Sequence, residues 1–321
     1  MTPLYQRASA ARVTAPALAH EVLGGLLGSP KTLPAKLFYD ARGASLFEEI
    51  CEQPEYYLTR AELEILRRHA TDIAALSGPD AVLIEYGSGA GIKVRSILDA
   101  LEQPAAYVPV DISQEQLVCV ARDVGRDYPG LRVRPVYADY TRRFVLPDVS
   151  SSGRRLAFFP GSTIGNFHPA EASVFLTRVR HAVGAGGALV LGVDRQKDPR
   201  VLHAAYNDQA GVTAAFNLNM LTRLNDEFGP SFDASRFSHR AYYNREAARI
   251  EMHLVSTLAQ TVRIGGATVS FENGETIWTE SSYKYGRDAL ETLVATAGFR
   301  MTALWTDSRK QFWVTFLTAE R

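Results

Sequence analysis

The sequence predicts an α/β protein built on a doubly wound parallel sheet, with a second α+β domain inserted into it. From about residue 61, short apolar runs alternate with amphipathic helical stretches; this rhythm stops after Asp194 and resumes near residue 284. Such alternation is typical of parallel strands joined by covering helices. We therefore expect one domain from residues 61–195 and 284–321, and a second from residues 1–60 and 196–283.

Each element of the first domain is predicted from the spacing of its apolar residues. In the stretch 61–76 they recur at helical spacing, whereas short apolar runs bounded by turn residues indicate buried strands. Pro109 lacks a backbone donor, so the second strand should pair only in part. We expect strands at 81–86, 107–110, 133–137, 156–160 and 188–193, with helices between them, including one at 169–183.

The region after Asp194 has a different pattern. Residues 196–283 begin with longer helical stretches and continue with β-like segments at 251–262, 267–271 and 276–285. The tail returns to the first pattern and should complete the first sheet, with a helix at 286–297 and strands at 299–305 and 311–318. The part between is then an insertion that packs with the first 60 residues.

Bulk composition excludes several classes of function. The 321 residues include 35 basic and 35 acidic ones, so no net field attracts nucleic acid or an anionic membrane. No apolar run has the length of a membrane span, and the N-terminus lacks a signal peptide. Cys51, Cys119 and seven scattered histidines predict neither a disulfide framework nor a metal site. We expect a cytoplasmic monomer without nucleic-acid or membrane partners.

The segment 81–91, AVLIEYGSGAG, joins an apolar strand to three glycines at alternate positions. Gly87, Gly89 and Gly91 do not form the G-x-G-x-x-G fingerprint of dinucleotide-binding proteins, because position 92 is Ile. With Glu85 two residues before the first glycine, the spacing is the one that binds S-adenosylmethionine (SAM) in class I methyltransferases. It predicts the Rossmann-like sheet of that class. The alternative is an ordinary strand–turn–helix junction.

Polar residues follow the next two strands, at the sheet edge where this fold binds its cofactor. Asp111 ends the second strand, where a carboxylate can accept hydrogen bonds from both ribose hydroxyls. Asp139 and Tyr140 end the third, where they can bind the adenine amino group and pack on its ring. Lys93 comes just beyond the glycine turn. The alternatives are turn aspartates and a solvated lysine in the first turn of a helix.

Two further segments suit a small polar substrate. The loop 159–166, FPGSTIGN, combines glycines, hydroxyls and a carboxamide, which suit a small polar substrate. It lacks the N/D-P-P-Y/F motif of methyltransferases that act on base amino groups, which argues against methylation of nucleic acid. Glu280 and Ser282 are two apart in a predicted strand, so they project from one face and suit a partner with two polar nitrogens, such as imidazole. The alternative for the loop is that its glycines and polar residues only form turns. The alternative for Glu280 and Ser282 is a polar strand edge that faces solvent. The aromatic residues between 38 and 57 are equally typical of a buried hydrophobic patch.

Seven motifs, in order, make the chain from about residue 30 resemble the histidine-specific N-α-methyltransferases of ergothioneine biosynthesis. They are PAKLFYDARG at 34–43, PEYYLTR at 54–60, EYGSGAGIK at 85–93, GSTIGN at 161–166, AYNDQAGVTAAFN at 205–217, RIEMHL at 249–254 and TESSYKY at 279–285. The resemblance implies methylation of the α-amino group of L-histidine and its methylated forms by SAM. Three successive transfers would give trimethylhistidine (hercynine).

The resemblance also implies a role for individual residues. The implied SAM site comprises Gly87, Lys93, Asp111, Asp139 and Tyr140. The implied substrate residues are Tyr56, Asn166 and Tyr206 at the carboxylate, Tyr39 and the backbone of Gly161 near the α-amine, Glu280 and Ser282 at the imidazole, and Phe47, Thr213 and Met252 as pocket walls. Tyr39 and Asn166 are the expected catalytic residues, because both can orient an amine without adding a negative charge.

The chain departs from the family pattern at Tyr86, Ala90 and Gly91, all in the cofactor turn. Three alternative functions remain. The first is a methyltransferase of the same family that acts on another amino acid, such as tryptophan or tyrosine, although an indole cannot use both Glu280 and Ser282. The second is a nicotinamide-dependent oxidoreductase, which the glycine spacing disfavours. The third is a non-catalytic binding protein, which the intact polar set disfavours.

Overall fold

The computed structural model describes residues 15–229, 231–264 and 266–320. Beyond the N-terminal residues, the chain divides into two compact units. Unit 1 comprises Leu58–Gln196 and Lys284–Arg321, and unit 2 comprises Val13–Tyr57 and Lys197–Tyr283. Residues 1–14, which are expected from the sequence to belong to the substrate domain, lie outside the described residues. That one unit binds cofactor and the other binds substrate stays a prediction.

Unit 1 is built on a seven-stranded sheet with the order β12-β13-β6-β5-β2-β3-β4. Its strands are β2 Val82–Tyr86, β3 Ala106–Asp111, β4 Val136–Tyr137, β5 Arg155–Phe159, β6 Ala188–Asp194, β12 Phe299–Thr306 and β13 Phe312–Ala319. Strand β13 runs antiparallel to both of its neighbours, β12 and β6, whereas the pairs β6–β5, β5–β2, β2–β3 and β3–β4 are parallel. Every residue of β2, β3 and β6 is buried, as expected where helices cover both faces.

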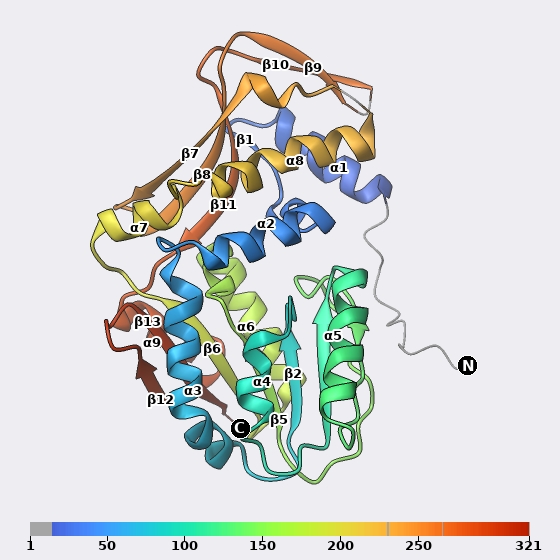
Figure 1. Cartoon of the computed structure of the whole chain (residues 1–321), viewed down its shortest axis with the longest axis vertical. Coiled ribbons are helices and arrows are strands. Elements are labelled where there is room, and N and C mark those ends of the chain that lie inside the picture. The colour runs from blue at the N-terminus through green and yellow to red at the C-terminus, as the bar shows by residue number, and fades with distance from the viewer. Residues whose placement is uncertain (1–14, 230, 265, 321) are drawn as a thin grey trace. The chain divides into compact units, whose positions relative to one another are not determined.

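Helices lie on both faces of this sheet (Figure 1). Their bounds are α3 Tyr57–Ser77, α4 Ile92–Leu98, α5 Gln114–Asp127, η2 Thr163–Asn166, α6 Pro169–Val183 and α9 Arg287–Thr296. The strand order reverses between β2 and β5. Because crossovers are right-handed, this reversal sends the helices that follow β2 and β5 to opposite faces. Sheets of this kind typically bind their ligands beside the carboxyl ends of the strands at such a reversal.

Unit 2 combines a four-stranded sheet, of order β1-β11-β8-β7, with a separate hairpin. The strands of the sheet are β1 Lys31–Thr32, β7 Phe237–Asn244, β8 Arg249–Ser256 and β11 Thr276–Tyr283, and the hairpin is β9 Gln260–Ile264 and β10 Ala267–Phe271. The helices are α1 Ala15–Leu27, η1 Ala35–Phe38, α2 Ala41–Glu52, α7 Pro199–Ala205, α8 Val212–Phe228 and η3 Ala234–Arg236. Helix α8 packs against α2, β7 and β8.

The predicted α/β class is confirmed, and the tail completes the first sheet through β12 and β13. Pro109 pairs fully with β2, and the missing donor falls on the side of β4, where only two residues pair. Two expectations for unit 2 are wrong. Residues 237–244, expected within helical stretches, form strand β7, and the segment 251–262 is interrupted between β8 and β9. The buried residues of β7 do not alternate regularly, so its sequence lacks a clear strand period.

Candidate active site

The glycine turn follows β2 at the carboxyl edge of the unit 1 sheet. Gly87, Gly89 and Gly91 have φ angles of 76°, 45° and 67°, which residues with a Cβ rarely adopt. The N–H of Gly87 donates to the carbonyl oxygen of Val110 at 2.8 Å, which ties the turn to β3. A Cβ added at Gly89 would meet no atom within 4 Å, so a ligand can approach the backbone there.

Asp111 lies against this turn and is only 8% exposed. Its Oδ2 accepts from the N–H of Gly89 at 3.3 Å and from the hydroxyl of Ser88 at 3.4 Å, and its Oδ1 accepts from the N–H of Ser113 at 2.8 Å. Burial raises the pKa of Asp111, and the backbone donors only partly oppose this shift. A carboxylate has about four lone-pair sites, so Asp111 keeps capacity for ribose hydroxyls.

Asp139 and Tyr140 come just after β4, at the same edge of the sheet. Oδ1 of Asp139 accepts from the N–H and the hydroxyl of Thr141, at 2.9 and 2.5 Å. Its Oδ2 is buried without a hydrogen-bond donor among the described residues, with Nε of Arg142 3.6 Å away. A buried acceptor without a donor is costly, and the amino group of adenine would supply one. This orphaned oxygen fits SAM.

The ring of Tyr140 contacts three other aromatic rings edge-on. The centroids of Tyr86, Phe159 and Phe175 lie 6.2, 5.8 and 5.9 Å from it. A Cβ added at Gly87 would lie 3.8 Å from Tyr140, so this ring stands directly beside the glycine turn. Tyr86, one of the departures from the family pattern, therefore supports the aromatic wall of the predicted cofactor site.

Glu62, which was not among the residues predicted from the sequence, binds both Lys93 and Gly161. The Nζ of Lys93 forms an ion pair with Oε2 of Glu62 at 2.6 Å. The N–H of Gly161 donates to both oxygens of the same carboxylate, at 3.0 and 2.9 Å. Gly161 has a φ of 79°, and a Cβ there would lie 3.4 Å from Nζ of Lys93. Glu62 is fully buried on α3.

The loop after Gly161 carries Asn166 and is held by the next strand of the sheet. Ser162 has a φ of 58°, and its hydroxyl oxygen accepts from the N–H of Asp194 at 2.8 Å. The chain then forms η2, whose last residue is the half-buried Asn166. Hydrogen bonds from β6 and from α3 therefore fix the backbone from which Asn166 projects.

In unit 2, four of the predicted substrate residues form a chain of edge-to-face aromatic contacts. The ring centroids of Tyr39 and Phe47 are 6.0 Å apart, those of Phe47 and Tyr56 are 6.3 Å apart, and those of Tyr56 and Tyr206 are 6.3 Å apart. Phe216 of α8 packs against both Tyr39 and Phe47. The motif 34–43 helps to hold these rings in place, because the Asp40 side chain caps the N-terminus of α2. Nδ2 of Asn219 donates to the Asp40 carboxylate at 2.9 Å.

Tyr206 and Ser282 meet directly: the phenol oxygen and the hydroxyl oxygen are 2.8 Å apart and buried. Burial raises the pKa of Tyr56 well above its ordinary value, and the neighbouring Tyr206, Cys51 and Glu280 raise it further. Tyr56 therefore stays a neutral phenol that can donate a hydrogen bond. The charge of Glu280 acts on this phenol within the same unit.

Strand β11 carries Glu280 opposite Met252 of β8 and Ser282 opposite Ile250. The pairing is irregular between Trp278 and Glu280, which leaves Thr279 between them free to turn toward α8. The single hydroxyl proton of Thr279 is shared between Oδ1 of Asn217, 2.7 Å from the hydroxyl oxygen, and the carbonyl oxygen of Met252, 3.0 Å from it. This bulge therefore locks the strand positions of the two predicted pocket residues Met252 and Glu280.

Thr213 and Asn217 are one turn apart on the buried face of α8. The N–H of Thr213 donates to Asp208 at 2.8 Å. Nδ2 of Asn217 lies 3.0 Å from Nδ1 of His239, whose Nε2 lies 3.0 Å from the carbonyl oxygen of Tyr206. A neutral ring that donates from Nε2 and accepts at Nδ1 satisfies both contacts, and burial lowers the pKa of His239 accordingly.

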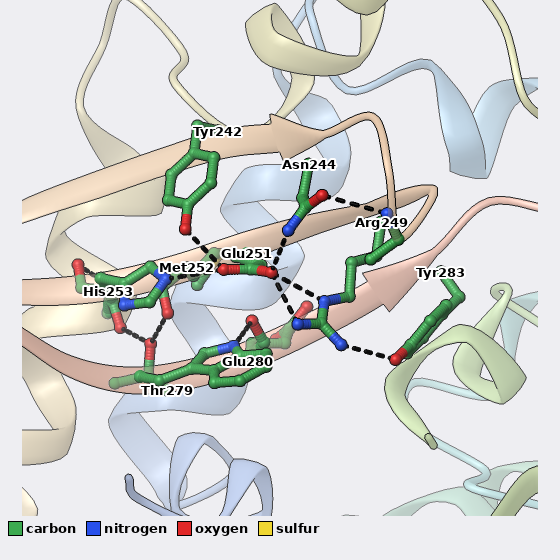
Figure 2. Close-up of polar contacts among 12 residues, drawn as sticks. Tyr242, Asn244, Arg249, Glu251, Met252, His253, Thr279, Glu280 and Tyr283 are labelled. Carbon is green, nitrogen blue, oxygen red and sulfur yellow. Dashed lines mark hydrogen bonds and ion pairs between the residues drawn. The ribbon is translucent and has the colours of Figure 1, made fainter. Parts of the chain in front are cut away.

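On the opposite face of β8, the carboxylate of Glu251 is surrounded by donors (Figure 2). Tyr242 donates to it at 2.6 Å, Asn244 at 2.9 Å and Nε of Arg249 at 2.8 Å, and Nε2 of His253 lies 3.3 Å away. Burial alone would raise the pKa of Glu251, but these hydrogen bonds lower it to about 2. The network stiffens β8 on the face opposite Met252.

The structure thus groups the predicted site residues in two sets. Unit 1 carries Gly87, Lys93, Asp111, Asp139, Tyr140, Gly161 and Asn166, and unit 2 carries Tyr39, Phe47, Tyr56, Tyr206, Thr213, Met252, Glu280 and Ser282. The proposed catalytic pair, Tyr39 and Asn166, is divided between them. Among the described residues, no cluster of three or more His, Cys, Asp or Glu side chains is arranged to bind a metal ion.

Comparison with known proteins identifies the family. Residues 18–319 match the family described as histidine-specific methyltransferase, SAM-dependent. A histidine N-alpha-methyltransferase of Mycolicibacterium smegmatis is 41% identical over 308 residues, which cover 94% of this chain and 95% of that protein. Ergothioneine biosynthesis protein 1 of Neurospora crassa is 32% identical over 285 residues, which cover 86% of this chain and 32% of that protein.

A solved structure of a possible exported protein from Bordetella parapertussis aligns with 94% of this chain and 87% of its own, with a TM-score of 0.51 and 13% identity, which shows a shared fold alone. The strand order of unit 1 and the glycine turn define a SAM-dependent methyltransferase of the class I fold. The chain belongs to the histidine-specific methyltransferase family. The resemblance found in the seven motifs is confirmed.

Three residues that contribute to these sets were missed from sequence. Glu62 interrupts the apolar stripe of a helix, a position where a charge signals a buried partner. Asn217 and Glu251 lie inside the motifs 205–217 and 249–254. The partners of Asn217 lie on other elements, and so do Tyr242 and Asn244, two of the four residues that contact Glu251, so local spacing does not reveal these contacts. The other two, Arg249 and His253, lie two residues from Glu251 on β8 itself.

Proposed function

We propose that this protein transfers methyl groups from SAM to the α-amino nitrogen of L-histidine, three times, to give trimethylhistidine. The observation that carries the substrate assignment is the polar group in unit 2: the Tyr206–Ser282 contact at 2.8 Å, with Glu280 two residues from Ser282 on the same strand face. Hydroxyls and a carboxylate on one face suit the two nitrogens of imidazole. An indole cannot bind both of these groups.

The residues of unit 1 are proposed to hold SAM, which supplies an electrophilic methyl group when bound. Asp111 would accept from the ribose hydroxyls, and the orphaned Oδ2 of Asp139 from the adenine amino group. Lys93 keeps N–H donors beyond the one directed at Glu62, and these suit the carboxylate of the methionyl part. Tyr140 would pack beside the adenine ring.

The residues around the substrate are proposed to orient it rather than to react with it. Tyr56 is held neutral by its raised pKa, so it can donate to the substrate carboxylate together with Tyr206 and Asn166. Tyr39 and Asn166 would orient the α-amine without a formal charge, because a carboxylate beside it would stabilise the unreactive ammonium. In well-oriented reactions, positioning of this kind lowers the barrier by roughly 7–11 kcal/mol.

A methylation assay with all twenty amino acids, read by mass spectrometry, tests the proposal. We expect histidine to be the preferred acceptor, with mono-, di- and trimethylated products appearing in succession under excess SAM. Preferential methylation of tryptophan or tyrosine would show that the family member acts on another amino acid. Accumulation of monomethylhistidine alone would contradict three transfers.

We further propose a role in ergothioneine biosynthesis, a cytoplasmic location and a monomeric state without nucleic-acid or membrane partners. The name of the Neurospora relative supports the first. The equal numbers of basic and acidic residues support the absence of nucleic-acid and membrane partners. None of the helices that the structure describes is long and apolar enough to cross a membrane. Light scattering of the purified protein would measure its mass in solution, and a dimer mass would contradict the monomer.

A further inference from the structure

Glu62 is a fully buried carboxylate that the mechanism above does not use. It lies on α3 between the buried residues Leu58 and Ile65, at a position where an apolar side chain would complete the stripe. Replacing a buried ion pair with well-packed apolar residues is often neutral or stabilising, so packing of α3 against the sheet does not require a charge here.

The partners of Glu62 come from the two loops that flank the switch point of the sheet. Lys93, in the first turn of α4, follows β2, and Gly161 follows β5. The carboxylate binds Nζ of Lys93 at 2.6 Å and the N–H of Gly161 at 3.0 and 2.9 Å. One side chain therefore connects the cofactor loop to the loop that carries Asn166.

The surroundings leave room for the carboxylate and for little else. A Cβ added at Gly192 of β6 would lie 2.0 Å from Oε1 of Glu62. At Gly161, a Cβ would lie 3.4 Å from Nζ of Lys93. Gly192 therefore leaves no room for a side chain beside the carboxylate, whereas at Gly161 the φ of 79°, rather than lack of space, favours glycine.

We propose that Glu62 is a positioning residue for SAM binding. It holds the ammonium of Lys93 and the amide of Gly161 in one fixed relation, so that the other N–H donors of Lys93 point at the anionic end of the cofactor. The inference rests on the proposed function only in assigning Lys93 to SAM, and it predicts a defect in cofactor binding that is independent of the methyl acceptor.

Glu62→Gln tests this relation, because the amide keeps an acceptor for Gly161 but removes the charge that holds Lys93. We expect the Kd for SAM, measured by calorimetry without histidine, to rise roughly tenfold or more. The KM for SAM should rise in parallel, while the KM for histidine stays within about twofold of the wild-type value, because the change removes a charge-assisted contact at the cofactor end alone. Glu64→Gln, two residues along the same helix and at the surface, is the matched control and should change neither value.

A merely structural role makes a different prediction. If Glu62→Gln lowers the melting temperature or kcat while the Kd and KM for SAM stay at wild-type values, the proposal is overturned. Should this variant not fold, Glu62→Asp, which keeps the charge but withdraws it by one methylene, is judged by the same criterion. Because SAM binding is measured alone, a wild-type protein that binds SAM without methylating histidine would refute the proposed acceptor and leave this test intact.

Discussion

The phenol oxygen of Tyr206 lies 2.8 Å from the hydroxyl oxygen of Ser282, across 76 residues of sequence. Tyr206 is the C-cap residue that follows α7, and Ser282 lies on β11. His239 contacts the carbonyl oxygen of Tyr206, and Asn217 binds His239 in turn. The proposed substrate group of unit 2 is therefore supported from α8 and β7 as well as from its own strand.

Ser282→Ala and Tyr206→Phe should show coupled effects. Each change removes one hydroxyl of a buried pair and breaks the contact between them, so each should lower kcat/KM for histidine by about tenfold. The double variant should lose less than the product of the two, with a coupling energy of about 0.5–3 kcal/mol. Steady-state kinetics of the four proteins measure this, and strictly multiplicative losses would show that the contact is not part of recognition.

Glu280→Ala should change substrate choice. Removing the carboxylate that we propose binds the imidazole N–H should lower kcat/KM for histidine by about tenfold or more, and bulky apolar amino acids should compete better. Competition assays with paired amino acids, read by mass, measure the shift. Glu272→Ala, exposed in the turn before β11, is the control. An unchanged substrate profile would remove Glu280 from the recognition set.

Asp139→Asn should weaken SAM binding without affecting histidine. In either orientation of the new amide, its NH₂ group would face a donor, since Thr141 donates on one side and adenine would donate on the other. We expect the Kd for SAM to rise about tenfold or more. Calorimetry checks this, with Asp123→Asn on the surface of α5 as the control. Wild-type affinity in the variant would place adenine elsewhere.

Glu251 should make stability depend on pH in the acid range. Its pKa in the folded protein is about 2, below the ordinary 4.5, so the ionised carboxylate favours folding above pH 4.5. This contribution is lost as the pH falls from about 4.5 to about 2. Melting temperatures across this range should fall steeply for the wild-type protein.

Glu251→Gln should flatten that decline and lower stability at neutral pH by about 1–3 kcal/mol, because Arg249 loses its carboxylate partner and keeps the hydroxyl of Tyr283. Glu246→Gln, exposed in the β7–β8 turn, should leave the profile unchanged. Parallel acid profiles for wild type and Glu251→Gln would show that other carboxylates dominate.

Local patterns were sufficient for the centre of unit 1 because β2, β3 and β6 are short apolar runs buried on both faces, and the turn after β2 needs glycine at fixed positions. Strand β7 in unit 2 was missed because it is only partly buried and its alternation is irregular. The pairing of Glu280 with Met252 also depends on a bulge that leaves no signature in the sequence.

The sequence by itself determined the fold class, the glycine turn, the family and the residue types of the predicted site, since each depends on spacing along one segment. Only the tertiary structure decided which of these residues meet. Glu62 reaches Gly161 across 99 residues, and Tyr206 reaches Ser282 across 76. A buried polar group must find its partner wherever packing brings a donor or acceptor close, and that distance is set by the whole fold.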